Sequence, residues 1–107
     1  MIPSVFSEFM KFIVDRTRSN DLKWIPGDGS SYITSHRGMS LYLSHDYNED
    51  RDLGSFWFRL ISENGQATTF SVFDYEDDYN FMRMLYEEII SNANNASSDV
   101  ERFMRNW

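Results

Sequence analysis

The sequence has 107 residues, no cysteine and a formal net charge of −7, from 17 acidic against 10 basic side chains. This length favours one domain over residues 1–107, the lack of cysteine excludes disulfides and thiolate chemistry, and the acidic balance argues against direct binding of nucleic acid. No apolar run approaches the ~20 residues needed to span a bilayer, and residues 1–8 lack the basic region of a secretory signal, so we expect a cytoplasmic protein without membrane contact.

The N-terminal segment has the pattern of an amphipathic helix. With Ser4 as its N-cap, the pattern predicts a helix over residues 4–19 that lies on a sheet. Residues 22–25 are apolar and precede a Pro/Gly turn over residues 26–31, so Trp24 belongs either to a short edge strand or to a plug under the helix. The apolar residues at helical spacing are Ile2, Val5, Phe6, Phe9, Phe12 and Ile13.

A first hairpin is predicted over residues 32–36 and 39–44, with its turn at Arg37 and Gly38. Met39, Leu41 and Leu43 share one face, while the opposite face is mostly hydroxyl. Residues 45–53 are polar and predict a loop. A two-residue turn pairs Tyr32 with Leu43, Ile33 with Tyr42, Thr34 with Leu41, and Ser35 with Ser40.

A second hairpin is predicted over residues 54–73, because Asn64-Gly65 is a strong signal for a two-residue turn. This turn predicts the pairs Phe56–Phe73, Phe58–Ser71, Leu60–Thr69, Trp57–Val72, Arg59–Phe70 and Ile61–Thr68. We expect Phe56, Phe58 and Leu60 to face the core, since they continue the apolar row of the first hairpin. Both faces of this hairpin are then apolar.

Two helices are predicted at the C-terminus. The acidic run of residues 74–78 suits a helix N-terminus, and helical spacing continues to about residue 93. Residues 98–101 have a capping-box signature, followed by the apolar stripe of a short last helix, Val100, Phe103, Met104 and Trp107. The predicted fold is α+β: an N-terminal helix, a four-stranded antiparallel meander, a C-terminal helix and a short last helix.

No catalytic, metal-binding or cofactor-binding residues are predicted, and we do not expect an enzyme. The segment from Asp46 to Trp57 resembles a calcium loop, but Arg51 replaces its glycine and Trp57 its bidentate glutamate. His36 and His45 are the only histidines, and neither has metal-ligand spacing. His45 beside Asp46 lacks a nucleophile in a suitable turn.

Two surfaces are candidates for binding a partner. The second face of the second hairpin carries an apolar set with Arg59 among its members: Trp57, Ile61, Phe70 and Val72. Either the last helix covers this set, or it forms a partner or dimer interface centred on Trp57 and Arg59, or the predicted register is misassigned. Two acidic clusters, expected at the same end of this hairpin, are either solvated loops and a helix cap or an acidic lip for a basic partner or a mimic of nucleic-acid phosphates. The members of the lip are Asp46, Glu49, Asp50, Asp52, Asp74, Glu76, Asp77 and Asp78.

The order of elements resembles a group of small bacterial and phage-borne proteins of no settled activity. The segments that carry the resemblance are Leu22-Lys23-Trp24, Ser31-Tyr32, residues 38–44 and Glu63-Asn64-Gly65. The resemblance implies a helix, a strand meander and a second helix, and it implies no function.

Three functions remain open. The first is a non-catalytic protein-binding module, such as a small acidic inhibitor, an immunity or antitoxin-like protein, or a phage-encoded counter-defence protein. The second is a binder of a nucleotide-like small ligand in a pocket between helix and sheet, with Arg37 or Arg59. The third is an acidic secretion-chaperone-like homodimer formed through the second hairpin.

Overall fold

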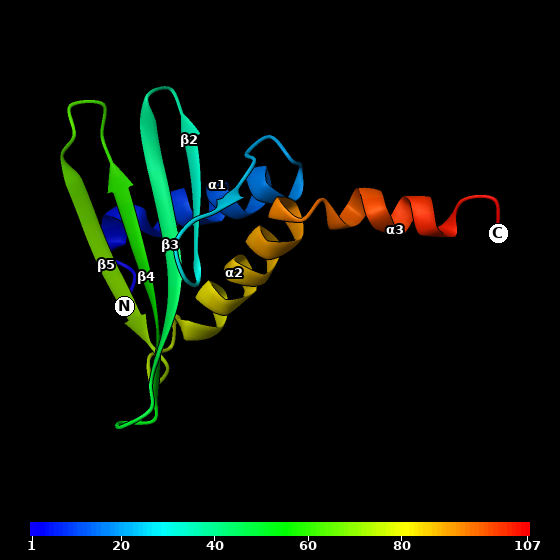
Figure 1. Ribbon diagram of the computed structural model, residues 1–107. Helices are drawn as coiled ribbons and strands as arrows, with labels where there is room; N and C mark the ends of the chain where they lie inside the picture. The colour runs from blue at the N-terminus through cyan, green and yellow to red at the C-terminus, as the bar shows by residue number, and fades with distance from the viewer.

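The computed structural model of residues 1–107 has one antiparallel sheet of five strands in chain order, with helices against one of its faces (Figure 1). The α+β class is confirmed, and the sheet has five strands instead of the predicted four because residues 25–26 pair with the next strand. The elements are η1 (Ser4–Phe6), α1 (Ser7–Arg18), β1 (Ile25–Pro26), β2 (Ser31–His36), β3 (Met39–Asn48), β4 (Leu53–Ile61), β5 (Ala67–Phe73), α2 (Tyr79–Ala93) and α3 (Ala96–Met104).

The core lies between the sheet and the pair of helices α1 and α2. It contains fifteen buried apolar residues. Trp24, Phe58, Leu43 and Leu85 are among those with no exposed surface. The N-terminal helix is confirmed, with a 3₁₀ turn before α1. Of the two readings of Trp24, the buried plug is confirmed, because Trp24 has no exposed surface and is not part of a strand; the short edge strand is formed by Ile25 and Pro26, which pair with β2.

A buried asparagine ties the end of α1, the segment before β1 and helix α2 together. The side-chain oxygen of Asn92 accepts the backbone N–H of Trp24 at 2.8 Å, and its amide nitrogen donates to the carbonyls of Leu22 at 2.7 Å and Thr17 at 3.0 Å. The Trp24 indole N–H donates to the Thr17 hydroxyl at 3.0 Å. These contacts satisfy polar groups that would otherwise be buried without partners.

The first hairpin is confirmed residue by residue. Ile33 pairs with Tyr42 and Thr34 with Leu41, as the two-residue turn predicts, and both Arg37 and Gly38 have positive φ. The polar loop predicted over residues 45–53 is wrong in extent, because β3 runs on to Asn48 and β4 begins at Leu53. Backbone hydrogen bonds hold this extension, and they do not require apolar side chains.

The predicted register of the second hairpin is wrong by one residue. The loop has three residues, 63–65: the Ser62 N–H donates to the carbonyl of Gln66 at 2.9 Å, the Gly65 N–H donates to the carbonyl of Ser62 at 2.9 Å, and Gly65 has φ +86°. Phe56 therefore pairs with Val72, Trp57 with Ser71, Phe58 with Phe70 and Arg59 with Thr69. A shift of one residue exchanges the faces of a strand, so the second face of the hairpin is not uniformly apolar.

Helix α3 does not cover the sheet. It packs at the C-terminal end of α2 and extends away from the domain (Figure 1), and none of its residues is buried. It begins at Ala96, after Asn95 in the left-handed conformation, and has no side-chain cap. The predicted capping box at residues 98–101 is therefore wrong, since the helix is already formed there.

Candidate functional site

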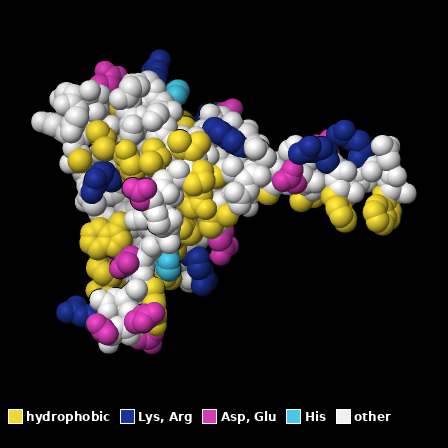
Figure 2. All heavy atoms as spheres, in the orientation of Figure 1, with side chains coloured by type: hydrophobic (Ala, Val, Ile, Leu, Met, Phe, Trp, Pro, Cys, Tyr) yellow, Lys and Arg dark blue, Asp and Glu magenta, His cyan; other side chains and the backbone are white.

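The face of the sheet opposite α1 and α2 is uncovered and carries a row of aromatic side chains; we call it the open face. Trp57 lies near its middle with 43% of its surface exposed. The ring of Phe73 meets Trp57 edge-on at 6.3 Å and stacks on Tyr75 at 5.8 Å. Figure 2 shows hydrophobic side chains gathered across the strands, with few charged ones among them.

Neighbouring strands fix the position of Trp57. Its indole N–H donates to the hydroxyl of Ser55 at 3.0 Å, two residues away on the same face, and the Ser55 side chain is itself buried. Across the strands, Tyr42 pairs with Arg59, and Ser44 pairs with Trp57. The result is a tryptophan oriented by a hydrogen bond, beside a cationic side chain on a regular β-surface.

A shallow depression of about 210 Å³ lies in this face. Its lining residues include Ser31, Tyr42, Ser44, Trp57, Arg59 and Thr69. Aromatic rings and one guanidinium thus meet in one place, with hydroxyls beside them, and tryptophan, tyrosine and arginine are the residues that most often anchor protein interfaces.

The structure separates the five residues predicted for this surface. Trp57, Arg59 and Ile61 do lie on the open face. Phe70 and Val72 do not: they are 7% and 0% exposed and belong to the core. The physical reason is the three-residue loop, which turns Phe70 and Val72 toward α1 and α2.

Sequence reasoning missed three aromatic members of the open face, Tyr42, Phe73 and Tyr75. A signal for Phe73 was present in β5, where polar Thr69 and Ser71 alternate with apolar Phe70 and Val72. This alternation places Thr69, Ser71 and Phe73 on one face. The stacking of Tyr75 on Phe73 depends on the turn after β5 and has no sequence signal.

The two acidic clusters lie at the same end of the sheet, as predicted. The Gly54 N–H donates to a carboxylate oxygen of Asp74 at 2.9 Å, and the Asp74 N–H donates to the carbonyl of Gly54 at 3.0 Å. These contacts join the start of β4 to the residue that follows β5. We keep the name acidic lip for the eight carboxylates at this end.

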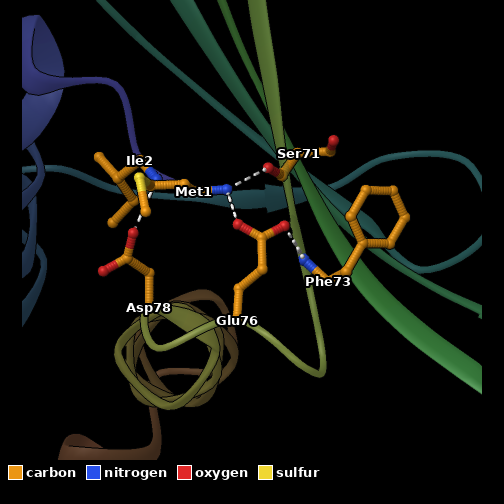
Figure 3. Close-up of polar contacts among 6 residues, drawn as sticks. All are labelled: Met1, Ile2, Ser71, Phe73, Glu76 and Asp78. Carbon is orange, nitrogen blue, oxygen red and sulfur yellow. Dashed lines mark hydrogen bonds and ion pairs between the residues drawn. The ribbon is translucent and has the colours of Figure 1, made fainter.

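Half of the acidic lip is engaged in structural contacts. Figure 3 shows two of these carboxylates holding the N-terminal segment: Glu76 forms an ion pair with the amino group of Met1, and Asp78 accepts the Ile2 N–H at 2.8 Å. Glu76 also accepts the Phe73 N–H at 3.2 Å. The hydrogen bond from the N-terminal ammonium, together with that from the Phe73 N–H, holds the pKa of Glu76 below its ordinary value against the opposing effect of burial.

Four carboxylates of the lip are free of side-chain contacts and exposed to solvent. Asp74 and Asp52 are occupied by Gly54 and by the hydroxyl of Tyr47. No side-chain hydrogen bond or ion pair engages the remaining four, which are Asp46, Glu49, Asp50 and Asp77. Asp46 pairs with Ser55 across the strands, so it lies at the edge of the open face itself.

His45 and Asp46 cannot work together as a base and its orienting carboxylate. They are consecutive residues of β3, and consecutive strand residues point to opposite faces. His45 instead lies among aromatic rings, 4.8 Å from the ring of Phe56 and 3.4 Å from the hydroxyl of Tyr79. Burial raises the pKa of Tyr79, with a further contribution from the charge of Asp74.

A small apolar cavity lies between α1 and the sheet. Its volume is about 70 Å³, far below the ~300 Å³ at which pockets for small ligands begin. Neither Arg37 nor Arg59 lines it. No group of three or more His, Asp or Glu side chains is arranged to hold a metal ion.

Comparison with protein-family models, with curated proteins and with solved structures found no match to this chain. None of its helices combines the length and apolar character that crossing a membrane requires.

Proposed function

We propose that this chain is a non-catalytic protein-binding module that docks a partner protein on the open face of its sheet. In kind it would be a small acidic inhibitor, such as an immunity or antitoxin-like protein or a phage-encoded counter-defence protein. The observation that carries the proposal is the exposed Trp57, locked by Ser55 and flanked by Arg59, on a face that no element of the chain covers.

The physical case rests on preorganisation. Tryptophan and arginine dominate the residues whose loss costs most at protein interfaces, and a side chain already held in one position loses little entropy on binding. Trp57 is held by a hydrogen bond on its polar edge and by contact with Phe73, and the exposed 43% of the residue is available to a partner. A regular sheet also changes little on binding, which favours a defined interface.

The acidic lip indicates the chemistry of the partner. Asp46 lies at the edge of the open face, and Glu49, Asp50 and Asp77 add uncommitted negative charge at the same end. A partner that presents an apolar or aromatic centre beside a basic rim would match both features. Its association rate and affinity should fall as salt rises, since exposed charges are screened over about 10 Å at 0.1 M ionic strength.

Binding of a nucleotide-like ligand is the weaker alternative. It would use the depression beside Tyr42, Trp57 and Arg59. Neither the small apolar cavity nor the neighbouring one of about 310 Å³, which Phe12, Arg16 and His36 line, contains Arg37 or Arg59. Thermal-shift screening with nucleotides separates the two functions, since a ligand at 100 times its Kd stabilises the fold by about 2.7 kcal/mol.

The test is affinity capture from the source organism with three immobilised forms: wild type, Trp57→Ser and Phe12→Ser. Phe12 is a matched control because it is also a half-exposed aromatic, 51% against 43% for Trp57, and lies on α1 on the opposite side of the sheet. We expect a partner that wild type and Phe12→Ser retain and that Trp57→Ser loses. The purified partner should bind one to one by calorimetry, with a loss of about 30-fold for Trp57→Ser.

Two results would overturn the proposal. One is the recovery of no stoichiometric partner by folded wild-type protein at low and moderate salt. The other is a partner that binds Trp57→Ser as tightly as wild type, since its site would then lie elsewhere on the chain.

A further inference from the structure

Helix α3 carries an apolar stripe that nothing in the chain covers. Phe103 and Trp107 are 74% and 98% exposed, and their rings stack at 5.8 Å. Val100 and Met104 complete the stripe, and both are more than half exposed. Figure 2 shows hydrophobic side chains along one side of α3 and charged side chains along the other.

The stripe needs a partner to be stable in water. A helix of nine residues is marginal when it stands alone, because the cost of nucleating it exceeds the gain from so few turns. Within the chain, α3 packs mainly on the end of α2. A second amphipathic surface that meets the stripe would both bury it and hold the helix.

We propose that this second surface is α3 of another copy of the chain, packed antiparallel about a two-fold axis so that the stripes of the two helices meet. Such an interface is self-complementary, as closed dimers require. It places apolar side chains at the centre and charged side chains at the rim, which is the usual anatomy of an interface.

The charges of α3 select the antiparallel direction. Its acidic side chains come before its basic ones along the chain: Asp99 lies in the first turn and Glu101 just past the middle, whereas Arg102 lies in the last turn and Arg105 is the C-cap. Antiparallel helices place the acidic half of each beside the basic half of the other, whereas parallel helices place like charges level with one another. The side chains already reach one another within the helix, where Arg102 contacts Asp99 at 2.8 Å and Arg105 contacts Glu101 at 3.2 Å.

The area of the stripe fits a reversible dimer. From the exposed fractions of its four side chains, the stripe offers about 600 Å² per copy, since a large aromatic side chain buries 150–250 Å². A symmetric pair would therefore bury at most about 1,200 Å² from these side chains, the lower end of the range for specific interfaces. Because α3 extends away from the domain, the two acidic bodies stay apart in this arrangement (Figure 1).

Sedimentation velocity of the full chain over a range of concentrations tests the proposal. We expect the mass to rise from 12.7 kDa toward twice that value as concentration increases. Phe103→Glu should weaken the association at least about 30-fold, as expected for a residue worth 2 kcal/mol at an interface. Ser98→Glu is the matched control, because it adds the same charge on the opposite side of α3 and should leave the equilibrium unchanged.

A mixing experiment guards against the trivial explanation that Phe103→Glu only unfolds α3. The double variants D99K/E101K and R102E/R105E carry all-basic and all-acidic helices, so each should stay monomeric alone, while their mixture should form a one-to-one heterodimer. A wild type that stays monomeric at every concentration would overturn the proposal. So would an association that survives Phe103→Glu but is lost in Trp57→Glu, since that would place the interface on the open face.

Discussion

Replacing Asn92 tests whether its hydrogen bonds hold the helices to the sheet edge. Asn92 is 5% exposed and bonds with the N–H of Trp24 and the carbonyls of Leu22 and Thr17. Asn92→Leu keeps the branched shape and the number of side-chain heavy atoms, so it removes the polar contacts without opening a cavity. Every buried side-chain polar atom of the chain has a hydrogen-bond partner. The substitution would leave buried backbone groups that bond with Asn92 without a partner.

The expected cost follows from the groups left without partners. The Trp24 N–H and the Leu22 carbonyl are both bonded by Asn92 in a buried setting. Each buried group that loses its partner costs about 1–3 kcal/mol, which gives a loss of about 4 kcal/mol for the pair. A domain of this size is stable by about 5–15 kcal/mol, so the variant should lose between about a quarter and four fifths of its stability.

Urea unfolding followed by tryptophan fluorescence and circular dichroism measures this loss. Asn94→Ala is the control, because Asn94 is exposed two residues further on and its side chain makes no hydrogen bond; it should change the unfolding free energy by about 0.5 kcal/mol or less. A loss below about 1 kcal/mol for Asn92→Leu would refute the reasoning, since water or an alternative backbone path would then satisfy these groups.

Two further predictions concern the acidic lip and the second hairpin. The N-terminal ammonium of Met1 lowers the pKa of Glu76 in the folded state, so the contribution of the ionised Glu76 to stability is present above the unfolded pKa and is lost as pH falls through the folded pKa. The difference in unfolding free energy between wild type and Glu76→Gln should therefore shrink in acid. A constant difference between pH 7 and pH 3 would contradict the pairing. Gly65→Ala places a Cβ at φ +86° with open space around it, so thermal or urea unfolding should show a loss of about 1 kcal/mol from backbone strain alone, and an unchanged stability would show that the turn rearranges.

The second hairpin shows where local sequence rules conflict. Asn64-Gly65 indicates a two-residue turn, and the first hairpin obeys the same rule at Arg37 and Gly38. In the second hairpin the alternation of residues 69–72 favours a different register, and burial of Phe70 and Val72 decides in its favour. The free energy of burying two apolar side chains exceeds the difference between two turn types, so the pattern along the strand should outweigh the turn signal.

Contacts between distant parts of the chain account for what could not be predicted. The amphipathic pattern of α3 is plain in the sequence, but whether it lies on the sheet or leaves the domain depends on the backbone at Asn95. The role of Asn92 is equally hidden, because its partners Thr17 and Trp24 are 75 and 68 residues away. Helical spacing predicts that position 92 is buried, but it does not predict which polar groups form hydrogen bonds with Asn92.

The two proposed surfaces are separated along α2. The acidic lip and the end of the open face lie at the start of this helix, and α3 leaves from its far end, about 22 Å away for 15 residues at 1.5 Å each. The four charges of α3 cancel, so the net charge of −7 resides in residues 1–95. Self-association through α3 therefore neither blocks the open face nor brings the acidic lips together. For this reason the two proposals can fail separately: Trp57→Ser should leave the monomer–dimer equilibrium unchanged, and Phe103→Glu should leave the one-to-one affinity for a partner unchanged.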